Sequence, residues 1–262
     1  MNRTAISDAA SWAGSFIKAE WRLLLPVALA FFALPQLAVQ VFAADALTLA
    51  EAQRGSPAML LWFLPMMLGN IVGGIALSAL AIVPRITVGD AIGRGIRRLP
   101  TLFVACVILV AVLAAVIFAG MIVFGVAAAG LGLGRAGIVT LLSAFVSIVG
   151  IICVVRLTFL FPALADHEST ALAALKETWR LTRPVFWQLL GLFLLLLVVS
   201  GIIGLAIQAS LGSVLLLLGK MLGGEAVARA LILIITTAIG AAFSGGFYVL
   251  SAAIYAQRRG AT

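Results

Sequence analysis

Few residues of this chain could do chemistry, and the densest group of them is a single run. Asp166, His167 and Glu168 are adjacent, and His167 is the only histidine among the 262 residues. A single histidine cannot form a two-histidine zinc site. Because His167 lies outside the long apolar stretches of the chain, it also cannot serve a Ser–His pair within them. Neighbouring side chains also diverge instead of converging on an ion. We interpret this run as a polar turn before a helix, and we expect no enzyme activity, no metal and no cofactor.

Two other patterns carry weaker chemical signals. Gly89, Gly93 and Gly95 in GDAIGRG fit neither the phosphate-loop spacing nor the dinucleotide-binding spacing. Cys106 and Cys153 both fall within apolar stretches. We interpret them as small apolar residues, not as a disulfide or metal-binding pair.

Arg156 is the charged residue with the least expected surroundings. It lies in an apolar stretch, about a turn and a half before Pro162. A charge within the membrane is costly and by default indicates a function. A long side chain near the membrane edge can instead extend its charge to the interface. Both interpretations stay open, with Asp166, Glu168 and lipid phosphate as candidate partners.

Composition defines the class of protein. Hydrophobic residues make up 64% of the chain and charged residues 10%, and the mean hydropathy is +1.26. These values predict an all-α integral membrane protein forming one domain over residues 1–262, since the alternation typical of membrane barrels is missing. Six stretches reach the roughly 20 residues needed to span a bilayer; they are 23–45, 58–83, 101–129, 136–162, 185–211 and 226–256.

The basic residues are divided unevenly between the two sides of these spans. Four lie on one side, namely Arg54, Arg135, Lys220 and Arg229, and the other side holds the remaining thirteen of the 17. Loops rich in Lys and Arg stay in the cytoplasm. The bias predicts cytoplasmic termini and six spans arranged as three hairpins. It also accounts for the net charge of +8, which therefore does not argue for nucleic acid and instead suits an anionic membrane surface.

A basic amphipathic element precedes each predicted hairpin, at intervals of roughly 80 residues, as an internal repeat would. The three elements cover residues 8–21, 88–99 and 169–183. In the third, Leu172, Leu175 and Trp179 recur at helical spacing and form an apolar stripe. A cationic stripe lies beside it. These patterns predict interfacial helices with the apolar face among lipid headgroups.

Two interpretations of these elements remain open. Trp, Arg and Lys anchor many spans at the interface, so the elements could be purely architectural. The functional interpretation is that they bind anionic lipid headgroups or a partner protein. Its candidate residues are Arg94, Arg97, Arg98, Arg156, Lys176, Trp179, Arg180 and Arg183.

The stretch 156–190 resembles the membrane domain found with bacterial glycerophosphoryl diester phosphodiesterases, and the related YciC-like inner-membrane proteins. The resemblance rests on a Phe-Pro-Ala-Leu segment at 161–164, an acidic turn, an Ala-Leu helix and the Thr-Trp-Arg-Leu-Thr-Arg run at 178–183. It implies a location in the bacterial inner membrane. In the fused phosphodiesterases a soluble catalytic domain follows the membrane domain. This chain ends at Thr262, so we do not expect that activity here.

The leading hypothesis is a non-enzymatic bacterial inner-membrane protein that engages anionic lipid or a protein partner through its interfacial helices. The alternative is a transporter, or a permease subunit, for an amphiphilic or lipid-like substrate. Polar residues and prolines within the spans favour the alternative. The lack of a clear acidic residue at mid-depth weakens ion-coupled transport.

Overall fold

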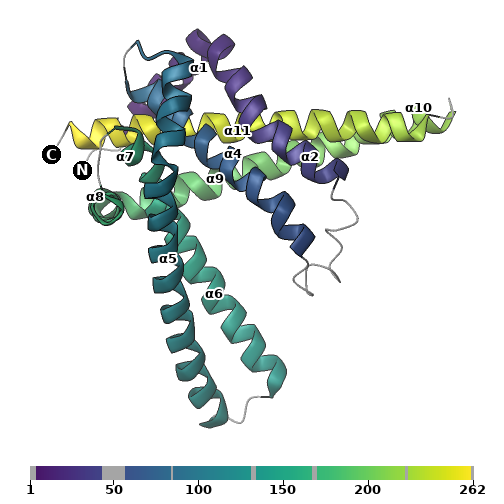
Figure 1. The fold of residues 1–262 in the computed structure, drawn as a ribbon. Helices are drawn as coiled ribbons and strands as arrows, with labels where there is room; N and C mark the ends of the chain where they lie inside the picture. The colour runs from purple at the N-terminus through teal and green to yellow at the C-terminus, as the bar shows by residue number, and fades with distance from the viewer. Residues whose placement is uncertain are drawn as a thin grey trace.

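The computed structural model describes residues 4–42, 57–83, 85–130, 134–166, 170–221 and 224–260. These residues are helical almost throughout, and no strand occurs among them (Figure 1). In chain order the elements are α1 (Thr4–Ala28), the π-helical turn η1 (Leu29–Ala33), α2 (Leu34–Phe42), α4 (Pro57–Ile82), α5 (Val88–Gly130), α6 (Arg135–Leu157), α7 (Leu160–Asp166), α8 (Ala171–Thr182), the 3-10 turn η3 (Arg183–Val185), α9 (Phe186–Ile207), the π-helical turn η4 (Gln208–Gly212), α10 (Ser213–Met221) and α11 (Glu225–Arg259).

Six helical stretches of the described residues are long and apolar enough to cross a membrane. They run over Asp8–Val41, Leu64–Ile82, Val88–Ala127, Gly137–Asp166, Ala171–Met221 and Ala226–Arg259. This agrees with the predicted all-helical chain containing six apolar segments.

The long helices splay from one shared region, where α7, α8 and both ends of the chain lie (Figure 1). α5 and α6 project from it side by side, and α9, α10 and α11 extend in another direction. The projecting parts leave large apolar side chains uncovered by the protein, for example Phe118 at 66% exposure and Leu205 at 69%. Such surfaces suit lipid as the surrounding solvent.

Of the six long apolar stretches, the one in α4 is the most buried, and α4 contacts α1, α5, α7 and α11. Ile75, Ala76 and Leu77 are fully buried. Small residues allow this close approach: a Cβ on Gly73 would lie 2.6 Å from the Cβ of Phe31, and one on Gly74 would lie 2.9 Å from the Tyr248 ring. Small residues are the usual means of close helix packing in membranes.

The helix α7 lies at the centre of the shared region, and its residues Leu160 and Pro162 to Ala165 are buried. The predicted span 136–162 therefore does not continue as one helix: α6 ends at Leu157, a turn follows, and α7 begins at Leu160. A proline is tolerated in the first turn of a helix but not in its interior. Pro162 occupies the first turn of α7, so the restart accommodates it.

The second amphipathic element, 88–99, is not a separate interfacial helix. It is the first part of α5, a single helix of 43 residues that continues through Pro100. Thr87 and Asp90 start it with reciprocal side-chain bonds, since the Asp90 amide donates to Thr87 Oγ1 and Thr87 Oγ1 donates to Asp90 Oδ2. The face packed inward holds Ala91, Gly95 and Leu102, whereas Ile96 is 54% exposed. The helix continues past this proline, which removes one backbone hydrogen bond, and α5 packs against α4.

The first and third elements differ from the second. α1 contains a kink at Glu20 (φ −108°, ψ 18°), which sets residues 4–19 apart from the helix that follows. α8 covers Ala171–Thr182, and the Thr170 side chain caps its start by accepting a bond from the Ala173 amide. The chain then turns at η3 and enters α9 in a different direction (Figure 1).

The helical path does not stop at the predicted end of the span 185–211. A π-helical turn, η4, occupies Gln208–Gly212, and the helical path continues into α10. π-Helical turns within helices are rare and frequently mark functional sites.

The two glycines Gly93 and Gly95 give a matched test of the α4–α5 contact. A Cβ on Gly95 would lie 2.9 Å from the Val72 carbonyl oxygen, whereas one on Gly93 would meet only the Arg97 side chain at 4.0 Å. We expect Gly95→Ala to destabilise the protein by about 1–3 kcal/mol through overpacking. Gly93→Ala should be neutral, or stabilising by about 0.5–1 kcal/mol from helix propensity. Thermal unfolding in detergent checks both, and equal midpoints for the two variants would contradict the packing described.

Candidate functional site

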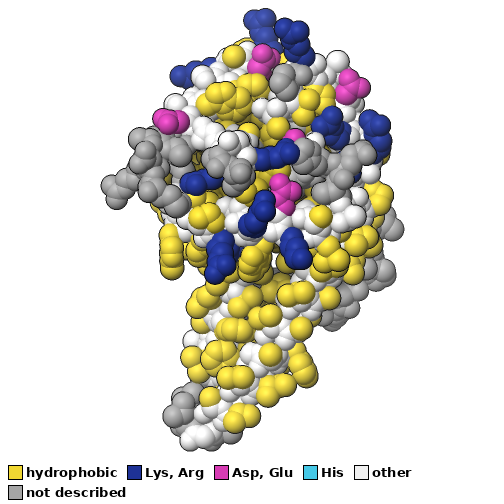
Figure 2. Space-filling model, turned by 90° about the vertical axis from the view of Figure 1, so that its left-hand side faces the viewer, with side chains coloured by type: hydrophobic (Ala, Val, Ile, Leu, Met, Phe, Trp, Pro, Cys, Tyr) yellow, Lys and Arg dark blue, Asp and Glu magenta, His cyan; other side chains and the backbone are white. Residues whose placement is uncertain are grey.

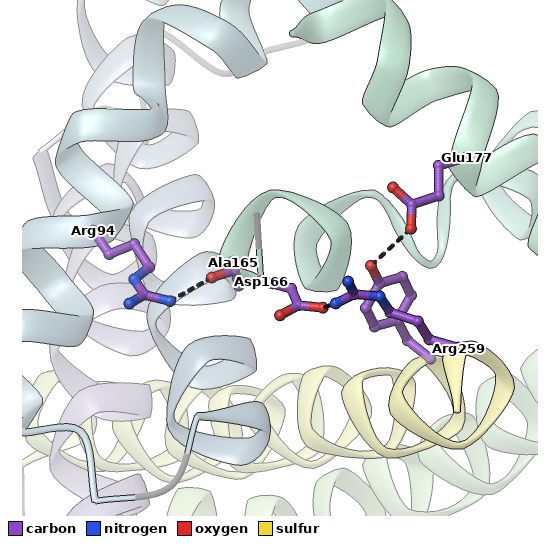
Figure 3. Close-up of polar contacts among 6 residues, drawn as sticks. Arg94, Ala165, Asp166, Glu177 and Arg259 are labelled. Atoms are coloured by element: carbon purple, nitrogen blue, oxygen red, sulfur yellow. Dashed lines mark hydrogen bonds and ion pairs between the residues drawn. The ribbon is translucent and has the colours of Figure 1, made fainter. Parts of the chain in front are cut away.

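The C-terminal end of α7 is tied to the rest of the structure by side chains from two other helices (Figure 3). Arg94 of α5 donates from Nη1 to the carbonyl oxygen of Ala165 at 2.7 Å. The last carbonyls of a helix have no partner within the helix and carry partial negative charge. A guanidinium from α5 therefore suits this position both as a donor and as a positive charge.

Arg259, in the last turn of α11, forms an ion pair with Asp166 at the end of α7. The side chain of Asp166 is 17% exposed and that of Arg259 is 39% exposed. Partial shielding from water strengthens the attraction between the two charges. The cost of removing the charges from water offsets part of this gain. The pair joins two segments 93 residues apart.

A third contact connects α11 to α8. The hydroxyl of Tyr255 donates to Glu177 Oε1 at 3.1 Å, and the Tyr255 side chain is fully buried. Its ring meets that of Phe159 edge to face, with centroids 6.1 Å apart. We call the group Arg94, Ala165, Asp166, Glu177, Tyr255 and Arg259 the polar junction.

Arg156 packs between aromatic rings at the end of α6. Its guanidinium carbon lies 4.7 Å from the Trp179 ring centroid and 5.0 Å from that of Phe186. Its Nη1 donates to the Trp179 carbonyl oxygen at 3.4 Å, while its Nε is buried and has no hydrogen-bond partner among the described residues. Cation–π contacts of this kind hold α6 against α8 and the start of α9. Of the predicted partners, Asp166 pairs with Arg259 instead, and Glu168 lies outside the described residues.

One side of α8 is exposed and carries both charge and apolar surface. Its exposed basic and large apolar residues are Leu172, Lys176, Trp179, Arg180 and the adjoining Arg183, which we call the α8 outer face. The side that packs inward holds instead Ala171, Ala174, Thr178 and Leu181. Two residues of the predicted apolar stripe therefore point outward, with Leu172 at 64% and Trp179 at 50% exposure.

The remaining predicted site residues lie on the first turns of α5. Arg94 belongs to the polar junction, whereas Arg97 is exposed and its Nε donates to the Gly93 carbonyl oxygen at 3.3 Å. Arg98 is half-buried. Figure 2 shows Lys and Arg side chains gathered on the face near α8 and the chain ends, while the projecting part below is apolar.

Three side chains of the polar junction were not singled out from the sequence as site residues, namely those of Glu177, Tyr255 and Arg259. Arg259 had contributed only to the charge bias, and Tyr255 lay within a predicted span. Their partners are 78 and 93 residues away, so no local pattern could have indicated the pairs. Within the described part of the chain, no group of three His, Cys, Asp or Glu side chains could hold a metal ion.

A family model described as "Domain of unknown function (DUF7847)" matches residues 22–258. The chain belongs to this family. The match begins just after the kink of α1 at Glu20, so the first part of α1 lies outside the DUF7847 region. No curated protein and no solved structure was found to match the chain.

The ion pair of this DUF7847 chain can be tested by a double-mutant cycle. We expect Asp166→Asn and Arg259→Gln each to lower the free energy of unfolding by about 1–3 kcal/mol, because each removes one charge of a partly shielded ion pair. The double variant should lose less than the sum of the two, since they act on one contact. Unfolding in detergent measures all three, and Arg258→Gln is the control of equal charge. Strictly additive losses would show that the pair is not energetically coupled.

Proposed function

We propose that this chain is a non-enzymatic protein of the bacterial inner membrane, with six spans arranged as three hairpins and both termini in the cytoplasm. The α8 outer face, with Arg97 and Arg98 nearby, would bind anionic lipid headgroups. The observation that carries this proposal is the exposure of basic and aromatic side chains side by side on α8.

The arrangement of the helices supports the proposed topology. Both ends of the described chain lie with the polar junction, and the far ends of α5 with α6 and of α10 with α11 lie away from it (Figure 1). A helix as long as α5 would reach about 65 Å at 1.5 Å per residue, against a hydrocarbon core of about 30 Å. Its first turns, with Arg94 to Arg98, then fall outside the core on the side of α8.

The α8 outer face combines apolar, aromatic and basic side chains, and this composition suits a membrane surface better than water. Leu172 is largely uncovered by protein and Trp179 is half exposed, while Trp187 at the start of α9 is 79% exposed. Tryptophan concentrates at the headgroup level of membranes. Each basic residue near an anionic surface contributes about 1 kcal/mol. Three of them on α8 and the adjoining η3 provide a substantial attraction that needs no specific pocket.

The relationship to the phosphodiesterase-associated membrane domain and the YciC-like proteins is part of this proposal. Its support is the Phe-Pro-Ala-Leu segment and the Trp-Arg-Leu-Thr-Arg run. In this structure the first contributes the buried α7, and the second lies on α8 and η3. The first segment therefore lies in the packed region between the helices. The second lies on α8 and η3, and some of its side chains face outward.

Photocross-linking tests the lipid proposal. In nanodiscs that carry a phosphatidylglycerol probe with a photoreactive headgroup, we expect adducts on the peptide covering 170–187. The variant Lys176→Gln/Arg180→Gln/Arg183→Gln should reduce their yield about tenfold or more, because about 1 kcal/mol is lost per charge.

Two comparisons complete this experiment. A phosphatidylcholine probe should give few adducts on the same peptide, and Lys18→Gln/Arg22→Gln/Arg258→Gln, which removes equal charge elsewhere, should leave the yield unchanged. An undiminished yield in the α8 variant would refute the lipid proposal. A bound protein recovered only with the unaltered outer face would favour a protein partner instead.

A transporter of amphiphilic substrates is the second candidate, favoured by open cavities between α9 and α11. Purified protein reconstituted into vesicles should then accelerate the movement of a fluorescent phospholipid between leaflets, read as a larger fraction quenched by dithionite. Movement no faster than in protein-free vesicles would remove this candidate.

A further inference from the structure

A cavity of about 390 Å³ lies between α1 and the turn that joins α4 to α5. Its walls are mostly apolar, and the two charged residues that line it are Glu20 of α1 and Arg85 of the turn. Ligand pockets in proteins usually have volumes of about 300–1,000 Å³. We call this space the α1–α4 cavity. It shares no residue with the polar junction or with the α8 outer face.

One wall of the α1–α4 cavity is aromatic. Trp12, Phe16 and Glu20 follow one another at four-residue spacing, so they lie on the same face of α1. The rings of Trp12 and Phe16 are stacked, with centroids 5.1 Å apart and planes inclined by 8°. The facing wall is aliphatic and includes Leu80 and Ile82. The cavity therefore offers an apolar surface directly beside a carboxylate.

The two charged residues of the cavity have no partner in the described part of the chain. Glu20 is half-buried and Arg85 is exposed, and no hydrogen bond or ion pair joins either side chain to another described residue. Arg22 does not serve Glu20, because its guanidinium carbon lies over the Trp21 ring, 5.8 Å from the centroid. A carboxylate partly withdrawn from water is costly unless a cation pairs with it. A cation from outside the protein would meet this need.

The backbone is irregular at both charged residues. Glu20 departs from helical geometry (φ −108°, ψ 18°) and kinks α1. Arg85 has φ 61°, the only positive φ among the described residues other than glycine. A left-handed conformation is uncommon for a residue with a side chain, and such conformations cluster at ligand sites. These two irregularities place opposite charges from distant parts of the sequence on the wall of one cavity.

The position of the cavity along the predicted spans indicates what kind of ligand would meet it. Glu20 precedes the first predicted span, 23–45, and Arg85 follows the second, 58–83. In the proposed topology both lie at the cytoplasmic edge of the membrane, where phospholipids carry their charges. A matching ligand needs a cation for Glu20, an anion for Arg85 and an apolar part for the aromatic wall. A phospholipid with an amine headgroup supplies all three.

We infer that the α1–α4 cavity binds one phosphatidylethanolamine molecule. Its ammonium donates to the Glu20 carboxylate, its phosphate lies at Arg85, and the first part of an acyl chain lies beside Trp12 and Phe16. Phosphatidylglycerol offers no cation to Glu20, and the quaternary nitrogen of phosphatidylcholine has no hydrogen to donate. The inference rests on the membrane insertion and topology proposed above, but not on lipid binding by the α8 outer face.

The test uses the whole protein in nanodiscs that carry a trace of one photoreactive lipid. The probes are phosphatidylethanolamine, phosphatidylglycerol and phosphatidylcholine, each with the reactive group at the same position near the glycerol end of an acyl chain. We expect adducts on the peptides covering 12–24 and 80–86. The phosphatidylethanolamine probe should give about tenfold more of them than the other two, because only it makes the charged hydrogen bond to Glu20.

Substitutions at Glu20 test the source of this preference. Glu20→Gln should lower the phosphatidylethanolamine adducts about tenfold, to the level of the other probes, since the carboxylate is lost. Glu20→Lys should reverse the preference, so that phosphatidylglycerol labels the cavity best. Asp8→Asn is the matched control, because it removes a carboxylate of the same helix that does not line the cavity, and it should change nothing.

Substitutions at Arg85 test the phosphate contact. Arg85→Gln should lower the phosphatidylethanolamine adducts about fivefold, whereas Arg85→Lys keeps the positive charge and should retain most of them. Lys18→Gln is the matched control, since it removes a basic residue of α1 that does not line the cavity. A thermal midpoint within a few degrees of the unaltered protein confirms that each variant folds.

Two outcomes overturn the inference. One is equal labelling of the cavity by the three probes in the unaltered protein, and the other is a preference that survives Glu20→Gln. Adducts of the phosphatidylglycerol headgroup probe on 170–187 report on the α8 outer face, whereas those on 12–24 and 80–86 report on the cavity. Either proposal can therefore fail without the other.

Discussion

The structure depends on satisfying the buried end of one short helix. α7 lies among α4, α5, α8 and α11 and ends in a carbonyl and a carboxylate that face other helices. Polar groups in such surroundings are costly unless they are paired. Arg94 and Arg259 supply the partners. Arg94 lies near the start of α5 and Arg259 near the end of α11. Pairing the carbonyl and the carboxylate of α7 therefore brings the start of one long helix close to the end of another.

This constraint divides the basic residues into two kinds with different roles. Arg94, Arg156 and Arg259 are engaged by carbonyls, rings or a carboxylate within the protein. Lys176, Arg180 and Arg183 lie exposed on α8 and the adjoining η3. Both kinds add equally to the charge bias that predicts topology, yet only the second kind is free to meet a membrane surface or a partner. The net charge of the chain is therefore a poor measure of how strongly it attracts anions.

Outside the shared region the helices diverge, and most of their apolar surface meets no other part of the protein. In water this arrangement would be unfavourable, because the hydrophobic effect would drive the helices together. In a bilayer there is no such force, and lipid chains cover the helices.

The sequence alone determined the helical class and the six apolar segments, because spanning length and hydropathy are local properties of the chain. It also located α8, whose cap and periodicity are local. It did not determine that residues 88–130 form one helix, that α7 is separate from α6, or that Leu172 and Trp179 face outward, since packing against other helices decides these. The polar junction came only from the tertiary structure. Its contacts join residues 71 to 93 positions apart, and no pattern along the chain records which helices meet.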